Sequence, residues 1–135
     1  ARDYTNKQTI EKRSPDASAD IYQLLAGLCV ACRHGFEMEN AEAEAERTFA
    51  DGDIHDSKNA ERYATLAQLP DSCAASADCL ERQRKVYEKH GVFSPAMIDG
   101  IINQLRSFND RTLRQEIENK EMIMEKLVRQ YYHCG

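Results

Sequence analysis

The sequence has no tryptophan, only 3 prolines and 6 glycines, and no long apolar run. No segment alternates apolar with polar residues as a strand would, whereas apolar residues recur repeatedly at helical spacing. The most apolar stretch, residues 21–32, is shorter than the roughly 18 residues that a membrane-spanning helix needs. We therefore expect an all-α protein, a compact bundle of five or six helices stapled by disulfides, without a membrane span.

An excess of positive charge is also lacking. The chain has 23 acidic and 18 basic residues and a formal net charge of −5. Proteins that bind nucleic acid gain much of their affinity from basic surface, so we expect no nucleic-acid partner. The acidic balance is compatible with another protein as partner, including a basic one, because opposite charge steers encounter. A homodimer is left open.

The apolar pattern divides the chain into an arm and a helical domain. Residues 1–13 have no periodic apolar face, which predicts a flexible N-terminal arm before a single helical domain over residues 14–135. Ser94 followed by Pro95 predicts the start of a helix, since Pro suits the first helical position. An earlier helix is expected to bury one stripe of side chains as core. The stripe consists of Ile21, Leu24, Leu25, Leu28, Cys32 and Phe36.

Five cysteines in 135 residues are many for a chain of this size. Exported proteins keep disulfides and cytosolic proteins usually do not, so we expect the mature chain of a periplasmic or secreted protein. We read residues 71–79 as a turn that precedes a helix over residues 80–90, and we predict a disulfide between Cys73 and Cys79. Cys29 or Cys32 is predicted to pair with Cys134. The odd count leaves one thiol unpaired or joined elsewhere.

The stretch from Cys73 to Arg82 reads Cys-x5-Cys-Leu-Glu-Arg. It resembles a segment of the periplasmic lysis-inhibition proteins (antiholins) of T-even phages. The resemblance covers about ten residues, and it implies a helical, exported protein that acts by binding another protein.

Cys29 and Cys32 form the only Cys-x-x-Cys pattern, and it lies inside a predicted helix rather than at a helix start, where a thiolate would be stabilised. A thiol-redox protein using this pair is one alternative. A cytosolic scaffold stabilised by zinc is another, with a set of candidate ligands formed by Cys29, Cys32, His34, His133 and Cys134. No phosphate loop or catalytic motif appears, so we expect no catalytic residue, no resident metal and no cofactor.

The acidic segment over residues 37–53, which we expect to continue the preceding helix as far as residue 50, provides the candidate surface for a partner. Its proposed binding residues are Glu42, Glu44, Glu46, Asp51 and Asp53. Charge complementarity could dock a basic protein there, although such a run is also typical of a solvated helix face. The sequence thus favours a small non-enzymatic extracytoplasmic binding protein of the inhibitor, immunity or lysis-regulator type.

Overall fold

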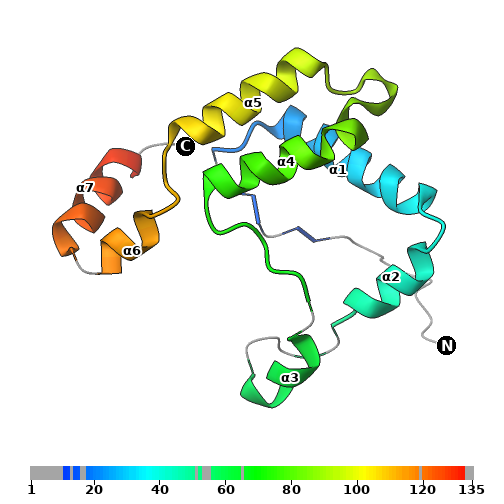
Figure 1. Cartoon of the computed structure of the whole chain (residues 1–135), viewed down its shortest axis with the longest axis horizontal. Helices are drawn as coiled ribbons and strands as arrows, with labels where there is room; N and C mark the ends of the chain where they lie inside the picture. Colours follow the sequence, from blue (N-terminus) through cyan, green and yellow to red (C-terminus); the bar gives the residue numbers. More distant parts are fainter. Residues whose placement is uncertain are drawn as a thin grey trace.

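The computed structural model of the chain describes residues 11–12, 14–15, 18–50, 52, 56–64, 66–118 and 120–132. All regular structure in these ranges is helical, which confirms the predicted all-α class (Figure 1). None of the described helices is long and apolar enough to cross a membrane. In chain order the elements are α1 (Ile21–Glu37), α2 (Ala41–Thr48), the 3₁₀ turn η1 (Ser57–Asn59), α3 (Ala60–Tyr63), α4 (Cys73–Glu88), the 3₁₀ turn η2 (Lys89–Gly91), α5 (Pro95–Ser107), α6 (Leu113–Glu118) and α7 (Glu121–Tyr131).

Side-chain caps set the start of the three longest helices. Asp20 begins α1, where its Oδ1 accepts hydrogen bonds from the backbone N–H groups of Tyr22 and Gln23 at 2.9 and 3.0 Å. Ser94 begins α5 with Pro95 in the first turn, as the sequence predicted. Such caps satisfy backbone donors that have no partner within the helix.

The structure contradicts the turn that we predicted over residues 71–79. Ser72 caps α4, and its Oγ accepts a hydrogen bond from the N–H of Ala75 at 3.1 Å. The segment that follows is rich in alanine, the strongest helix former, so the helix begins at Cys73 rather than near residue 80.

This early helix start removes the expected disulfide between Cys73 and Cys79. Six residues of helix separate two Cα atoms by about 9 Å along the axis, beyond the roughly 7 Å that a disulfide can bridge. The cysteines at positions 29, 32, 73 and 79 are all free thiols, and Cys134 lies outside the described residues. The predicted disulfide staple is therefore not found among the described cysteines.

We expect Cys73 and Cys79 to be recovered as free thiols from the natural protein. The measurement is alkylation in denaturant without reductant, followed by peptide mapping. Both cysteines should carry the alkyl group, because their helix holds them too far apart to pair. A peptide linked through these two cysteines would contradict the helix start at Cys73.

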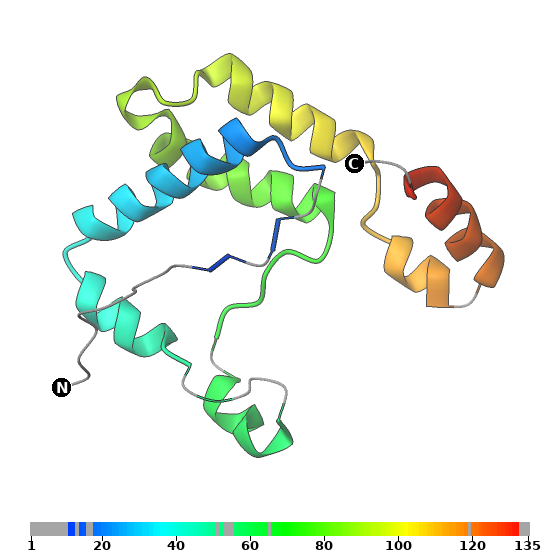
Figure 2. The ribbon, with the colours of Figure 1, turned by 180° about the vertical axis from the view of Figure 1, so that it is seen from behind.

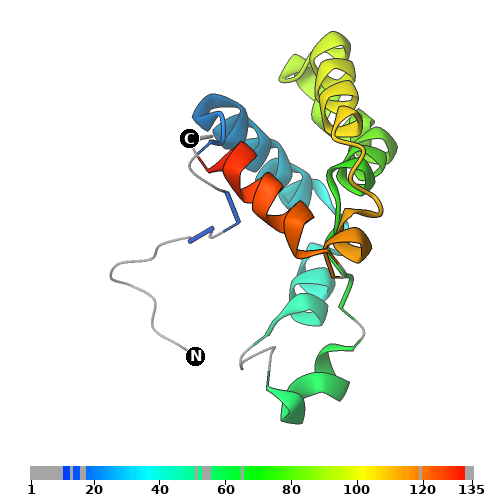
Figure 3. The ribbon, with the colours of Figure 1, turned by 90° about the vertical axis from the view of Figure 1, so that its left-hand side faces the viewer.

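The core lies where α4 packs between two other helices. α4 contacts α5 extensively and α1 on another side, and these three helices run close together in Figures 1 and 2. Viewed from the side in Figure 3, the α4–α5 pair stands beside α1. The buried cluster that joins them consists of Val30, Ala77, Phe93, Ile98 and Ile102.

Most of the α1 side chains that we predicted as core face solvent instead, and Leu24 and Leu28 are only half-buried. Leu25 is 56% exposed and Phe36 is 90% exposed, whereas Val30 is 1% exposed. The reason is that α4 packs on a different side of the helix, where Val30 is buried with Ala26 against it. Sequence spacing located the apolar positions of α1 but predicted the wrong ones as buried.

The remaining helices extend away from this core. α6 and α7 contact each other and no other described helix, and they lie beyond the end of α5 in Figures 1 and 2. α2 contacts α1, and α3 contacts only η1. The long acidic helix that we expected to continue α1 is interrupted, since Met38 is extended and α2 begins at Ala41. The described helices thus do not close into one bundle.

Candidate functional site

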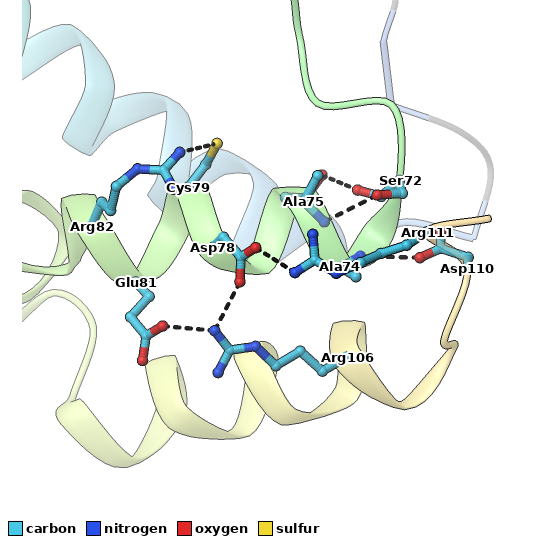
Figure 4. Close-up of polar contacts among 11 residues, drawn as sticks. Ser72, Ala74, Ala75, Asp78, Cys79, Glu81, Arg82, Arg106, Asp110 and Arg111 are labelled. Atoms are coloured by element: carbon cyan, nitrogen blue, oxygen red, sulfur yellow. Dashed lines mark hydrogen bonds and ion pairs between the residues drawn. The ribbon is translucent and has the colours of Figure 1, made fainter.

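The densest group of polar contacts lies where α4 begins beside the link from α5 to α6 (Figure 4). Asp110, in that link, accepts hydrogen bonds from the backbone N–H groups of Cys73 at 2.6 Å and Ala74 at 3.1 Å. Its carboxylate therefore caps α4 from a distant part of the chain. Ser72, which directly precedes the helix, caps the same end. A negative charge is favoured at this helix end by the helix dipole.

A second carboxylate, Asp78, lies one turn further along α4 and binds two arginines. Its Oδ1 accepts from Arg106 of α5 at 2.9 Å, and its Oδ2 accepts from Arg111 of the α5–α6 link. Arg106 also donates to Glu81 at 2.6 Å. Hydrogen bonds from Arg111 and then Arg106 lower the pKa of Asp78 below its usual value. This network fixes the end of α5 against α4, as Figure 4 shows.

The ionisation of Asp110 and Cys73 is adjusted by the same contacts. Burial alone would raise the pKa of Asp110, but hydrogen bonds from the N–H groups of Cys73 and Ala74 outweigh it, so the pKa is lowered. Burial first, and then the neighbouring Asp110 carboxylate, raise the pKa of the Cys73 thiol. A raised pKa leaves less of the thiol as thiolate at neutral pH, which disfavours Cys73 as a nucleophile.

Replacing Asp110 with alanine is expected to destabilise the fold by about 0.5–2 kcal/mol, as for other lost helix caps. Because the pKa of Asp110 is lower in the folded state, the destabilisation by this variant should be full at pH values above 3.8, the ordinary pKa of Asp. It should shrink as the pH falls below that value. Urea denaturation at several pH values measures this. Asp71→Ala, an exposed neighbour, is the matched control, and equal effects of both variants at neutral pH would contradict the cap.

A third polar group joins the far ends of α1 and α4. Arg33 of α1 donates to the backbone carbonyls of Val86 at 3.3 Å and Lys89 at 3.5 Å, near the end of α4 where the helix dipole favours a cation. Glu37 accepts from Lys89 Nζ at 2.6 Å and lies 3.8 Å from His90 Nε2. The hydrogen bond from Lys89 lowers the pKa of Glu37. These contacts position helices relative to each other.

The three groups have the chemistry of structural joints. The carboxylates of Glu37, Asp78 and Asp110 are each occupied by cations or by backbone donors. Within the described ranges, no three His, Cys, Asp or Glu side chains are grouped so that they could hold a metal ion. A shallow depression of about 300 Å³ also opens beside α5. Its lining is uncharged and consists of Gln23, Met97, Gly100, Ile101 and Gln104.

The cysteines predicted as functional lie apart from these groups. Cys29 and Cys32 are exposed on α1 and carry free thiols. Their predicted partner Cys134, like His133 of the alternative zinc site, lies outside the described residues. The described structure therefore brings neither a disulfide nor a third metal ligand to this pair.

The acidic candidates fall on α2 and on the segment after it. Glu42, Glu44 and Glu46 are exposed or half-exposed on α2, and Glu44 forms an ion pair with Arg47 one turn away. Asp51 and Asp53 lie outside the described residues. Helical spacing places Glu42 and Glu44 on different sides of the helix, so the three glutamates do not form one compact acidic patch.

Sequence reasoning missed the contacts that link α4 to the α5–α6 link. Asn109 and Asp110 lie in a break between α5 and α6, where Asn109 has a φ of +48°. What the sequence could have suggested is that an Asp at such a break can cap another helix. Which helix it caps depends on packing between segments more than thirty residues apart, as the Asp110–Ala74 contact shows.

Comparison with protein-family models matches residues 2–125 to the family described as glutamine synthetase, catalytic domain. Searches of curated proteins and of solved structures each found no match. The family match overturns the predicted non-enzymatic binding protein of the inhibitor, immunity or lysis-regulator type. It also overturns both alternatives, the thiol-redox protein and the zinc scaffold. The absence of a catalytic motif misled us, because a helical segment can belong to an enzyme without showing one. The chain belongs to the glutamine synthetase catalytic domain family.

Proposed function

We propose that the protein acts in the synthesis of glutamine, as a ligase. The observation that carries the proposal is the family match, which covers residues 2–125 of the 135. Glutamine is the side-chain amide of glutamate, so its synthesis joins ammonia to a carboxylate. In water this step needs an energy source, which ligases take from a nucleoside triphosphate.

The described helices would serve this enzyme as a scaffold. Their carboxylates at positions 37, 78 and 110 are committed to holding helices together. Side chains that are held by packing and by polar contacts are what a precise site needs in the elements beneath it. We therefore assign the core of α1, α4 and α5 the role of supporting the catalytic groups rather than supplying them.

Glutamine formation by the natural protein is the direct test. The protein is incubated with glutamate, ammonia and a nucleoside triphosphate, and the product is measured by chromatography. We expect glutamine to appear only when all three are present. A folded protein that forms no glutamine under these conditions would contradict the proposal.

Variants of the scaffold separate a supporting role from a catalytic one. Asp78→Asn removes the charge that holds Arg106 and Arg111, and it should lower thermal stability while leaving the KM for each substrate unchanged. The exposed Asp71→Asn is its control. A large rise in KM at unchanged stability would instead place Asp78 at the substrate.

The compartment and the partners remain predictions. The expectation of an exported protein depended on disulfides, and the four described cysteines form none. Peptide mapping and fractionation of the source cells would test it. A basic protein partner and a homodimer are likewise untested.

A further inference from the structure

Cys29 and Cys32 are neighbours on the exposed surface of α1. They are three residues apart within one helix, a spacing that places two Cβ atoms about 5–6 Å from each other. Both cysteines are exposed and carry free thiols. Figure 2 shows α1 in front of α4, with no other described helix over it. The two thiols are therefore open to a ligand that arrives from solvent.

The turn of α1 that carries the two thiols is held from its other side. Val30, which lies between them in the sequence, is 1% exposed and belongs to the buried cluster. Arg33, next to Cys32, donates to the backbone carbonyls of Val86 and Lys89. Because these contacts fix the helix, the spacing of the two cysteines is set before any ligand binds. A pair of ligands that is already in place loses less conformational freedom on binding.

The chemistry around the pair favours a soft metal ion with few ligands. Thiolate sulfur prefers soft ions such as Cu(I), whereas Mg²⁺ and Ca²⁺ take oxygen ligands. No charged residue occurs from position 21 to position 32, and the side chains one turn before and after the pair are the exposed Leu25 and Phe36. Among the described residues, no third His, Cys, Asp or Glu joins the two thiols, so the four ligands of a structural zinc site are not assembled there. Cu(I), in contrast, is stable between two sulfurs in a line.

The spacing of the two cysteines suits a bridging ion better than a disulfide. A disulfide needs Cβ atoms about 3.5–4.5 Å apart, which is closer than a regular helix holds residues three apart. A metal–sulfur bond is about 2.3 Å long for zinc, so an ion with bonds of that length separates two sulfurs in a line by about 4.6 Å. This separation is close to the Cβ spacing of helix neighbours. The ion therefore bridges the pair without distorting α1.

We propose that Cys29 and Cys32 form a two-coordinate binding site for Cu(I). Each thiol releases its proton to solvent as its sulfur bonds to the ion, and neither the sulfur nor the copper changes oxidation state. The site thus differs from the thiol-redox and zinc hypotheses, which require a disulfide or further ligands. It is also independent of the proposed synthesis of glutamine, because metal binding alone is measured.

Competition for Cu(I) with a coloured chelator tests the site. The reduced protein is added, without oxygen, to the Cu(I) complex of bicinchoninate, and the loss of colour measures transfer of the ion. A variant in which Cys73, Cys79 and Cys134 are replaced with serine isolates the pair. We expect the natural protein and this folded variant to take up Cu(I) with equal affinity. A natural protein that takes up no Cu(I), or a folded variant that has lost the binding, would overturn the proposal.

Variants of the pair itself, made in the natural chain, test whether the helix geometry matters. Cys29→Ser and Cys32→Ser should each weaken Cu(I) binding roughly a hundredfold, because a single thiolate loses the advantage of two linked ligands. The matched control combines Cys32→Ser with Ala31→Cys at an exposed position, which keeps the number of thiols but places two of them on opposite sides of α1. It should bind as weakly as Cys32→Ser alone, with circular dichroism confirming the helical fold. Binding by this control as tight as that of the natural protein would overturn the proposal, since the number of thiols rather than their spacing would explain it.

Discussion

Replacing Ile98 with alanine is expected to lower the free energy of unfolding by about 2–5 kcal/mol, the range for large-to-small changes at buried sites. Ile98 is 1% exposed and lies in the cluster where α5 meets α4 and α1. The lower stability has two sources: less apolar surface is removed from water on folding, and the variant has a cavity that rigid helices cannot fill. The effect is large because the core is small: only seven hydrophobic residues are buried among those described. A urea titration followed by helical circular dichroism measures the change.

Met97 provides the control at the neighbouring position of the same helix. It is 44% exposed, so Met97→Ala changes side-chain size with much less loss of burial. We expect an effect below about 1 kcal/mol for this variant, as is usual away from the core. If Ile98→Ala does not fold, Ile98→Val should cost about 0.5–1.5 kcal/mol and keep the comparison possible. Similar losses at positions 97 and 98 would contradict the assigned core.

Replacing Phe93 with alanine should have an effect of about 3–5 kcal/mol, typical of a buried aromatic side chain. Phe93 is 5% exposed in the turn between α4 and α5. Its ring meets the ring of Tyr87 edge to face, with centroids 5.9 Å apart and an interplanar angle of 74°. The chain reverses here through Gly91, whose φ is +67°. The ring therefore anchors the turn that sets α5 against α4.

Two variants test how this effect is divided. Tyr87→Leu keeps apolar volume but removes the edge-to-face contact, which is worth about 0.5–1.5 kcal/mol. Val92→Ala, next to Phe93 and 43% exposed, should cost little. The free energies of unfolding are compared between variants whose dependence on denaturant concentration has the same slope, since a changed slope would indicate a changed unfolded state. A loss at position 92 as large as at position 93 would contradict this packing.

The parts of the fold that the sequence predicted depend on contacts close along the chain. The Ser94–Pro95 start of α5 and the all-α class were correct, because caps and periodicity act within one or two turns. The start of α4 was wrong, because the Ser and Asp residues after Ser72 were read as turn formers although alanines surround them. That error also produced the predicted Cys73–Cys79 disulfide.

The function was predicted wrongly for a different reason. A small acidic chain without a catalytic motif suggested a binding protein, but the family match places it in an enzyme family. The polar groups at Asp78, Asp110 and Arg33 are made by residues far apart in the chain, and each joins a helix to a distant segment. Residues with supporting roles have no short motif, so motif searches find neither them nor the enzyme to which they belong.

By itself the sequence determined the helical class, the start of α5 at Ser94 and Pro95, and the apolar character of residues 21–32 in α1. These follow from propensity, capping and 3.6-residue periodicity, which are local properties. Only the tertiary structure decided which side of α1 is buried. Apolar side chains occur on more than one side of α1, and the choice depends on where α4 packs against Val30. It also decided that Asp110 caps α4, because that contact joins segments which only folding brings together.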